Sequence, residues 1–103
     1  MKNKKSQNKK QAESFAVSFT PIAWEEYVLW QKEDHNILDE INLLIEECQR
    51  DPFRGTGKPE PLKGDLTGYW SRRISKVHRL VYFPEDGAIY VVSCRYHYKV
   101  FSN

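Results

Sequence analysis

The chain has 103 residues and a formal net charge of +2, and 40% of its residues are hydrophobic and 14% aromatic. This length supports one compact domain, and this hydrophobic content excludes a wholly disordered chain. No segment approaches the roughly 20 consecutive apolar residues that span a bilayer, and no apolar stretch follows the basic start, so neither a membrane partner nor a secretory signal is expected.

The small net charge hides an uneven distribution along the chain. Residues 1–14 carry a charge of +4, residues 15–53 carry −7, and residues 54–103 carry +5. Such segregation fits a surface that meets an anion such as nucleic acid, and it fits solvated charged faces equally well. Residues 1–14 contain almost no apolar side chains, so we expect a mobile basic tail, followed by a single domain over residues 15–103.

The domain is predicted to begin with a short strand and a helix. Residues 15–19 have the composition of a strand, and Thr20-Pro21 has the pattern of a helix N-cap followed by proline. Apolar residues then recur at helical spacing as far as Trp30. Trp24 and Trp30 could stack on bases, but aromatic side chains at this spacing are more typical of a hydrophobic core.

A second helix is indicated by apolar residues that form one stripe from Ile37 to Cys48, opposite an acidic face. Asp34 is suited to cap its start, and Asp51-Pro52 is suited to end it. The join between the two helices is short, so they are predicted to form a helical hairpin.

Three strands are expected after an irregular segment, residues 53–68, that holds four of the five glycines. An irregular segment of this length in a small domain is usually functional or disordered. The strands cover residues 69–74, residues 77–83, and residues 88 to 96 or 98, with an Asp-Gly turn before the last strand. Short connections force antiparallel pairing. The fold class is therefore α+β in the order βααβββ, with the helical hairpin packed on one face of a mostly antiparallel sheet.

Side chains alternate between the two faces of a strand, which separates apolar from basic residues. Leu80 and Tyr82 share a face that suits the helices. In the last strand, alternation groups Val92 with Cys94 and Tyr96. The opposite face of the sheet is predicted to gather the basic residues Arg73, Arg79, Arg95 and His97.

Metal and thiol chemistry are not expected. The three histidines have no ligand spacing, and the cysteines are far apart in the sequence. Cys48 and Cys94 both lie in apolar patterns, which argues against a nucleophilic thiol. Two cysteines are also too few for a disulfide framework, which favours a reducing cytoplasmic location.

The remaining polar residues suit RNA cleavage without a metal, although a single surface glutamate or a histidine near a C-terminus is also typical of residues with no catalytic role. A carboxylate at Glu60, an imidazole at His97, a phenol at Tyr98 and several arginines are available. The ribose 2′-OH needs a base, the phosphorane-like transition state needs cations, and the 5′-oxygen leaving group needs an acid. Histidine can supply that proton because it titrates near neutral pH.

Several blocks of the sequence closely resemble the YoeB (Txe) toxins of the RelE-like superfamily. The likeness covers residues 15–98 and includes Trp24, Trp30 and the helix around Ile41-Asn42. The blocks that carry it are, in order, Pro52-Phe53, Gly55-Thr56-Gly57-Lys58-Pro59-Glu60-Pro61-Leu62-Lys63, Leu66-Thr67-Gly68-Tyr69-Trp70-Ser71-Arg72-Arg73-Ile74, His78-Arg79-Leu80-Val81-Tyr82, and Cys94-Arg95-Tyr96-His97-Tyr98.

This resemblance implies a bacterial type II toxin with a RelE-like or microbial-RNase-like fold. It implies a ribosome-dependent endoribonuclease that cuts mRNA in the A site of the 70S ribosome and so inhibits translation. It also implies neutralisation by a YefM-like antitoxin, whose complex with the toxin contacts operator DNA, and it is compatible with a homodimer. No cofactor is implied.

The resemblance also implies roles for single residues. Glu60 matches the general base, Arg79 the arginine at the scissile phosphate, His97 the general acid, and Tyr98 a tyrosine that positions the substrate. Three further basic residues match positions suited to RNA contact: Lys63, Arg72 and Arg73.

Two segments depart from the family pattern, namely the tail 1–14 and the extension 99–103. The extension contains apolar residues that could cover the active-site end or disturb antitoxin docking. Two other functions therefore stay open: a non-catalytic RNA- or ribosome-binding module of the same fold, and a corepressor that acts mainly with the antitoxin.

Overall fold

The computed structural model describes residues 14–96. The predicted basic tail, apart from Ser14, lies outside these residues, as do the extension 99–103 and the predicted site residues His97 and Tyr98. The elements, in chain order, are strand β1 (Ala16–Phe19), helix α2 (Pro21–Glu33), helix α3 (His35–Arg50), strand β2 (Glu60–Pro61), the 3-10 turn η1 (Gly64–Leu66), and strands β3 (Trp70–Arg73), β4 (Arg79–Glu85) and β5 (Ala88–Ser93).

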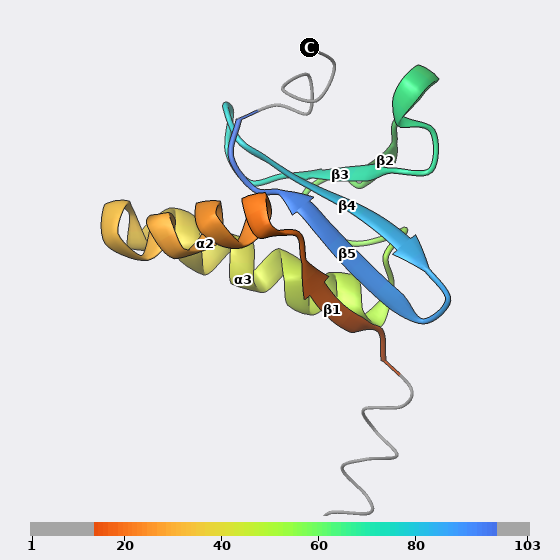
Figure 1. The fold of residues 1–103 in the computed structure, drawn as a ribbon, viewed down its shortest axis with the longest axis horizontal. Coiled ribbons are helices and arrows are strands. Elements are labelled where there is room, and N and C mark those ends of the chain that lie inside the picture. The colour runs from red at the N-terminus through yellow and green to blue at the C-terminus, as the bar shows by residue number, and fades with distance from the viewer. Residues whose placement is uncertain (1–13, 97–103) are drawn as a thin grey trace, which may run out of the picture.

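The strands form one five-stranded sheet in the order β1-β5-β4-β3-β2. Strand β1 pairs with β5 in parallel, and the other neighbours pair antiparallel. Both helices lie on the same side of this sheet (Figure 1). The predicted α+β class, with a helical hairpin on one face of a mostly antiparallel sheet, is confirmed.

The helix boundaries follow from their capping residues. The Thr20 hydroxyl accepts a hydrogen bond from the Ala23 amide at 3.2 Å, and proline opens α2, where a missing N–H costs nothing. Asp34 closes α2 and caps α3, because its carboxylate accepts from the amides of Asn36 and Ile37. The hairpin is therefore joined by a single residue.

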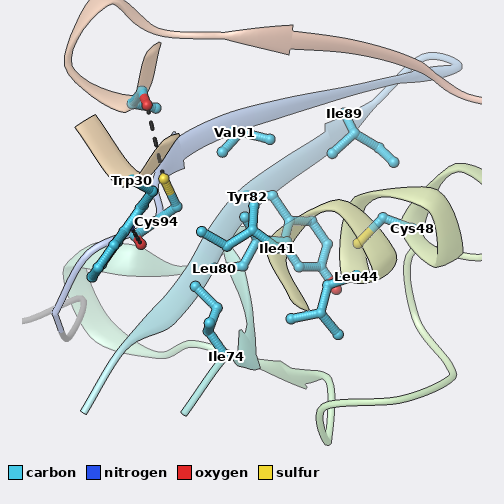
Figure 2. Close-up of a cluster of buried hydrophobic side chains, with 11 residues drawn as sticks. Trp30, Ile41, Leu44, Cys48, Ile74, Leu80, Tyr82, Ile89, Val91 and Cys94 are labelled. Atoms are coloured by element: carbon cyan, nitrogen blue, oxygen red, sulfur yellow. Dashed lines mark hydrogen bonds between the residues drawn. The ribbon is translucent and has the colours of Figure 1, made fainter. Parts of the chain in front are cut away.

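The core lies between the helices and the sheet, and Figure 2 shows it with Trp30 and Cys94 at one end and Cys48 at the other. Trp30 is 5% exposed and belongs to this core, as expected. Trp24 does not, since it is 53% exposed and packs against Phe19 and Tyr27 at the surface. The core comprises Ala23, Trp30, Ile41, Leu44, Cys48, Ile74, Leu80, Tyr82, Ile89, Val91 and Cys94.

A bulge in β5 changes the predicted alternation. Tyr82 pairs with Val91, but Val81 pairs with Ser93, so Val92 is an extra residue with no partner in β4. Ile89 and Val91 therefore face the core before the bulge, and Cys94 faces it afterwards. The predicted grouping of Val92 with Cys94 is wrong for this reason.

The strands are also shorter or displaced relative to the predicted ranges. Strand β5 ends at Ser93, and β4 runs from Arg79 to Glu85 instead of covering residues 77–83. The segment predicted to be irregular, residues 53–68, contains strand β2 and the turn η1. The Asp-Gly turn is confirmed, with positive φ values at Asp86 and Gly87, as a tight hairpin requires.

Candidate functional site

Three of the predicted site residues share the sheet face that is turned away from the helices, which we call the helix-free face. Glu60 of β2 pairs with Ser71 of β3, and Arg73 of β3 pairs with Arg79 of β4. Paired residues lie on the same face of a sheet, and so do residues two apart along a strand. Glu60, Arg73 and Arg79 therefore project from the same face.

Glu60 occupies the edge of the sheet in a two-residue strand. Proline at position 61 is tolerated there because an edge strand needs no N–H toward solvent. The next residue, Leu62, is 7% exposed and donates its backbone N–H to the Tyr69 carbonyl at 2.8 Å, which fixes the strand to the domain. Glu60 and Lys63 themselves are exposed.

Arg72 lies on the opposite face from Arg73 and is completely buried. Its Nη2 donates to the carbonyls of Asp51 and Arg54 at 2.7 Å each, and its Nη1 donates to the Thr56 carbonyl at 3.1 Å. Its Nε donates to the Tyr82 hydroxyl at 3.1 Å. A guanidinium enclosed in this way is not exposed to a ligand, so the placement argues against the predicted RNA contact of Arg72.

Arg72 instead holds the loop that leads into β2. Glu47 of α3 attaches the loop at a second point. Its carboxylate accepts from the Thr56 backbone N–H at 2.8 Å and from the Thr56 hydroxyl at 2.6 Å. Tyr82 donates its hydroxyl to the Pro52 carbonyl at 2.6 Å. These bonds stabilise the loop a few residues before Glu60.

Gly57 joins this loop to the sheet. Its carbonyl accepts from the Arg73 amide at 2.7 Å. Its φ is +85°, and an added Cβ would approach Leu44 at 3.0 Å and both Arg72 and Arg73 at 3.1 Å. Glycine is therefore required here by backbone conformation and by space.

Arg79 links the helix-free face to the chain that follows β5. Its backbone N–H donates to the Tyr96 carbonyl at 3.0 Å. Its side chain is half-buried, and Nη1 donates to the Ser75 carbonyl at 3.1 Å, within the connection between β3 and β4. Arg79 is thus bonded directly to the residue that precedes His97.

Helix α2 and His78 hold the chain between Cys94 and Tyr96. The Cys94 amide donates to the Glu26 carboxylate at 2.8 Å, and its carbonyl accepts from the Trp30 indole at 2.9 Å. The Tyr96 amide donates to Nδ1 of His78 at 2.7 Å. We call residues 94–96 the exit segment.

Arg95 of the exit segment turns away from the predicted basic cluster. Its Nη2 forms an ion pair with Glu33 of α2 at 2.6 Å, and its guanidinium lies 4.2 Å from the centroid of the Trp30 ring. The prediction that Arg95 gathers with Arg73 and Arg79 is therefore wrong. The attraction of a carboxylate and an aromatic face on α2 accounts for the difference.

Both thiols are buried, in agreement with the sequence prediction. Burial raises the pKa of Cys94 to about 12 and also raises the pKa of Cys48. Neither thiol is a nucleophile near neutral pH, because the thiolate is the reactive form. Burial likewise raises the pKa of Glu26 above its ordinary value, although hydrogen bonds from Cys94 and Ser93 oppose that shift.

Within residues 14–96, no group of three or more His, Cys, Asp or Glu side chains is arranged to hold a metal ion. No helix in the same part of the chain is both long and apolar enough to cross a membrane.

Sequence reasoning missed the contacts of Glu26, Trp30 and His78 with the exit segment. All three are long-range in sequence, separated from their partners by 68, 64 and 18 residues, so no local spacing reveals them. One local pattern does bear on His78. It lies two residues before Leu80, and alternation along an extended chain therefore puts it on the same side as Leu80, toward the core.

Comparison with known proteins identifies the family. Residues 19–98 match the family described as YoeB-like toxin of bacterial type II toxin-antitoxin system. Toxin YoeB of Streptomyces coelicolor is 56% identical over 82 residues, which cover 80% of this chain and 98% of the relative.

Solved structures from Staphylococcus aureus show the same relationship. A YoeB dimer is 45% identical, with a TM-score of 0.76, and a heterotetrameric YoeB-YefM toxin-antitoxin complex is 45% identical, with a TM-score of 0.75. Each match covers 82% of this chain and 98% of the other. The fold, the sequence blocks and these matches together establish that the chain belongs to the YoeB-like toxins of bacterial type II toxin-antitoxin systems.

Proposed function

We propose that the chain is a ribosome-dependent endoribonuclease that cuts mRNA in the ribosomal A site and needs no metal cofactor. One observation carries the proposal: Glu60, Arg73 and Arg79 share the helix-free face, and the Arg79 backbone bonds to Tyr96, directly before His97. A carboxylate, two arginines and an imidazole are the groups that this cleavage requires.

In the proposed reaction, the Glu60 carboxylate takes the proton of the ribose 2′-OH. The 2′-oxygen then bonds to the adjacent phosphorus, and the bond from phosphorus to the 5′-oxygen breaks. His97 gives a proton to that leaving oxygen. The products are a 2′,3′-cyclic phosphate and a 5′-OH, with one proton taken up by Glu60 and one released by His97.

The arginines have electrostatic roles in this proposal. Negative charge builds up on the phosphate oxygens as the 2′-oxygen bonds to phosphorus, and fixed cations lower the energy of that state. Arg79 is held by the Ser75 carbonyl and is suited to this role. Exposed Arg73 and Lys63 would bind the RNA backbone, and Tyr98 would position the substrate. Arg72 has no place in the reaction because its donors are occupied inside the domain.

The proposed partners are a YefM-like antitoxin, the 70S ribosome and, through the antitoxin, operator DNA. The Staphylococcus aureus YoeB-YefM complex supports the first of these, and the YoeB dimer from the same organism supports a homodimer of this chain. We expect the protein to act in the cytoplasm, where its ribosome substrate is found.

The test is mRNA cleavage on purified 70S ribosomes that carry a defined codon in the A site. The wild-type chain should cut within that codon, and primer extension should locate the cut. His97→Ala and Glu60→Ala should abolish cleavage, whereas Glu85→Ala, which changes an exposed glutamate at the end of β4, should cut like the wild type.

Sedimentation of the same mixtures separates the alternatives. Ribosome binding by the wild type without any cut would support a non-catalytic binding module. No ribosome binding, together with operator binding that varies with the ratio of toxin to antitoxin, would support a corepressor.

A further inference from the structure

We propose that His78 is a positioning residue for His97, acting through the backbone of Tyr96. This inference rests on the proposed function and adds a residue that it does not use. His78 directly precedes β4, and Arg79 is the first residue of that strand. Between them they bind both polar backbone groups of Tyr96. The His78 Nδ1 accepts from the Tyr96 N–H at 2.7 Å, and the Arg79 N–H donates to the Tyr96 carbonyl at 3.0 Å.

The backbone of Tyr96 needs such a restraint. Its φ is +62°, in the left-handed region that residues other than glycine rarely occupy. A residue in this conformation persists only where its surroundings hold it. Because His97 is the next residue, the dihedral angles of Tyr96 set the direction in which the chain presents the proposed general acid.

The imidazole of His78 is itself confined. Its ring meets Trp30 edge to face, with centroids 4.8 Å apart, and lies 5.2 Å from the ring of Tyr96. Trp30 is fixed in turn, because its indole N–H donates to the Cys94 carbonyl. The acceptor nitrogen is therefore set by aromatic contacts from α2 and from the exit segment.

The hydrogen bond also specifies the chemical form of His78. An imidazolium carries a proton on both nitrogens and has no acceptor. The contact with the Tyr96 N–H therefore requires neutral His78 with its proton on Nε2. In this form Nδ1 of His78 is the acceptor for the Tyr96 N–H.

The rest of the exit segment has hydrogen-bond partners other than His78. Glu26 and Trp30 bind the backbone of Cys94, and Glu33 binds the side chain of Arg95. Loss of the His78 acceptor should thus change the orientation at Tyr96 and beyond while the fold and the upstream contacts persist. A displacement of about 1 Å in a reacting group can lower a rate by about 100-fold.

Two variants of similar shape isolate the acceptor. His78→Asn keeps an oxygen at the position of Nδ1, and His78→Leu replaces it with a methyl group. The measurements are single-turnover cleavage on programmed ribosomes, with the maximal rate and the half-saturating concentration determined separately, and hydrogen exchange of the Tyr96 amide. His35→Ala, an exposed histidine that contacts the Gln31 carbonyl, is the control.

We expect His78→Leu to lower the maximal rate about 10- to 100-fold with little change in half-saturation, and to speed exchange at Tyr96. His78→Asn should recover most of the rate and the amide protection. A leucine variant as fast as the wild type, or an asparagine variant as slow as leucine, would overturn the inference alone. A wild-type chain that never cuts mRNA would overturn the proposed function and this inference together.

Discussion

The two faces of the sheet use arginine in opposite ways. On the helix-covered face, Arg72 is fully buried and its guanidinium bonds to three backbone carbonyls and to the Tyr82 hydroxyl. On the helix-free face, Arg73 is exposed, and among residues 14–96 its side chain has no hydrogen-bond or ion-pair partner. Neighbours in the sequence are thus separated into a structural cation and one that is accessible to a ligand.

The difference follows from the cost of burying charge. A buried guanidinium is stable only when its donors are satisfied, and the loop carbonyls around Arg72 satisfy them. The same bonds fix the loop before Glu60, so the covered face stabilises the segment that leads to the proposed site. Changes on the covered face should therefore act mainly on stability, and changes on the helix-free face mainly on activity.

The largest effect on stability is expected for Arg72→Met. It leaves the carbonyls of Asp51, Arg54 and Thr56 without their donor. Because an acceptor left unpaired inside a protein costs about 1–3 kcal/mol, the free energy of unfolding should fall by about 3–5 kcal/mol. Urea denaturation followed by circular dichroism measures this loss. A decrease below about 1 kcal/mol, the net value of a single ordinary hydrogen bond, would show that Arg72 does not hold the loop.

A smaller loss is expected for Tyr82→Phe, which removes one hydroxyl from the same network. Arg72 Nε loses an acceptor and the Pro52 carbonyl loses a donor, and both groups are inside the protein. The free energy of unfolding should fall by about 2 kcal/mol. If Tyr82→Phe unfolds at the same urea concentration as the wild type, water replaces the hydroxyl and the network is less important than we infer.

Glu47→Gln should cost about 1 kcal/mol at neutral pH, because an amide keeps only one of the two acceptors that bind Thr56. Those bonds, with Arg72 nearby, lower the pKa of Glu47 below its ordinary value of 4.5. Its stabilisation is therefore present above that value and is lost as the pH falls through the lowered pKa. The difference between variant and wild type should shrink below about pH 4.5, and a constant difference would contradict this account.

The smallest effect on stability is expected for Arg73→Met, which should change the free energy of unfolding by no more than about 0.5 kcal/mol. Its cleavage of A-site mRNA should nevertheless be weaker than that of the wild type. Together with Arg72→Met, this variant tests the comparison directly. Equal stability losses at the two positions would contradict the division between the faces.

Much of the fold could be predicted from local patterns. Thr20-Pro21 and Asp34 cap the helices as expected, and the Asp-Gly turn joins β4 to β5. In strand β3, alternation puts Arg72 on the same face as Trp70, which packs against the core. The resemblance to the family nevertheless suggested an RNA contact there, because a sequence block does not say which face a basic residue occupies.

Other features depend on contacts that local patterns do not contain. The extra residue Val92 reverses which side chains of β5 face the core, and the amino-acid composition of β5 does not indicate a bulge. Arg95 leaves the predicted cluster because Glu33 and Trp30, far away in the sequence, attract it. Strand β2 has only two residues and includes a proline, so only its pairing with β3 makes it recognisable.

The proposed catalytic site lies on the helix-free face, and Glu60→Gln is the sharpest test of that assignment. The measurement is the single-turnover rate of A-site mRNA cleavage, with Glu46→Gln, an exposed residue of α3, as the matched control. We predict at least about a 100-fold loss of rate for Glu60→Gln, with unchanged thermal unfolding, and a wild-type rate for Glu46→Gln. A Glu60→Gln protein that cuts at the wild-type rate would show that the helix-free face does not hold the catalytic base.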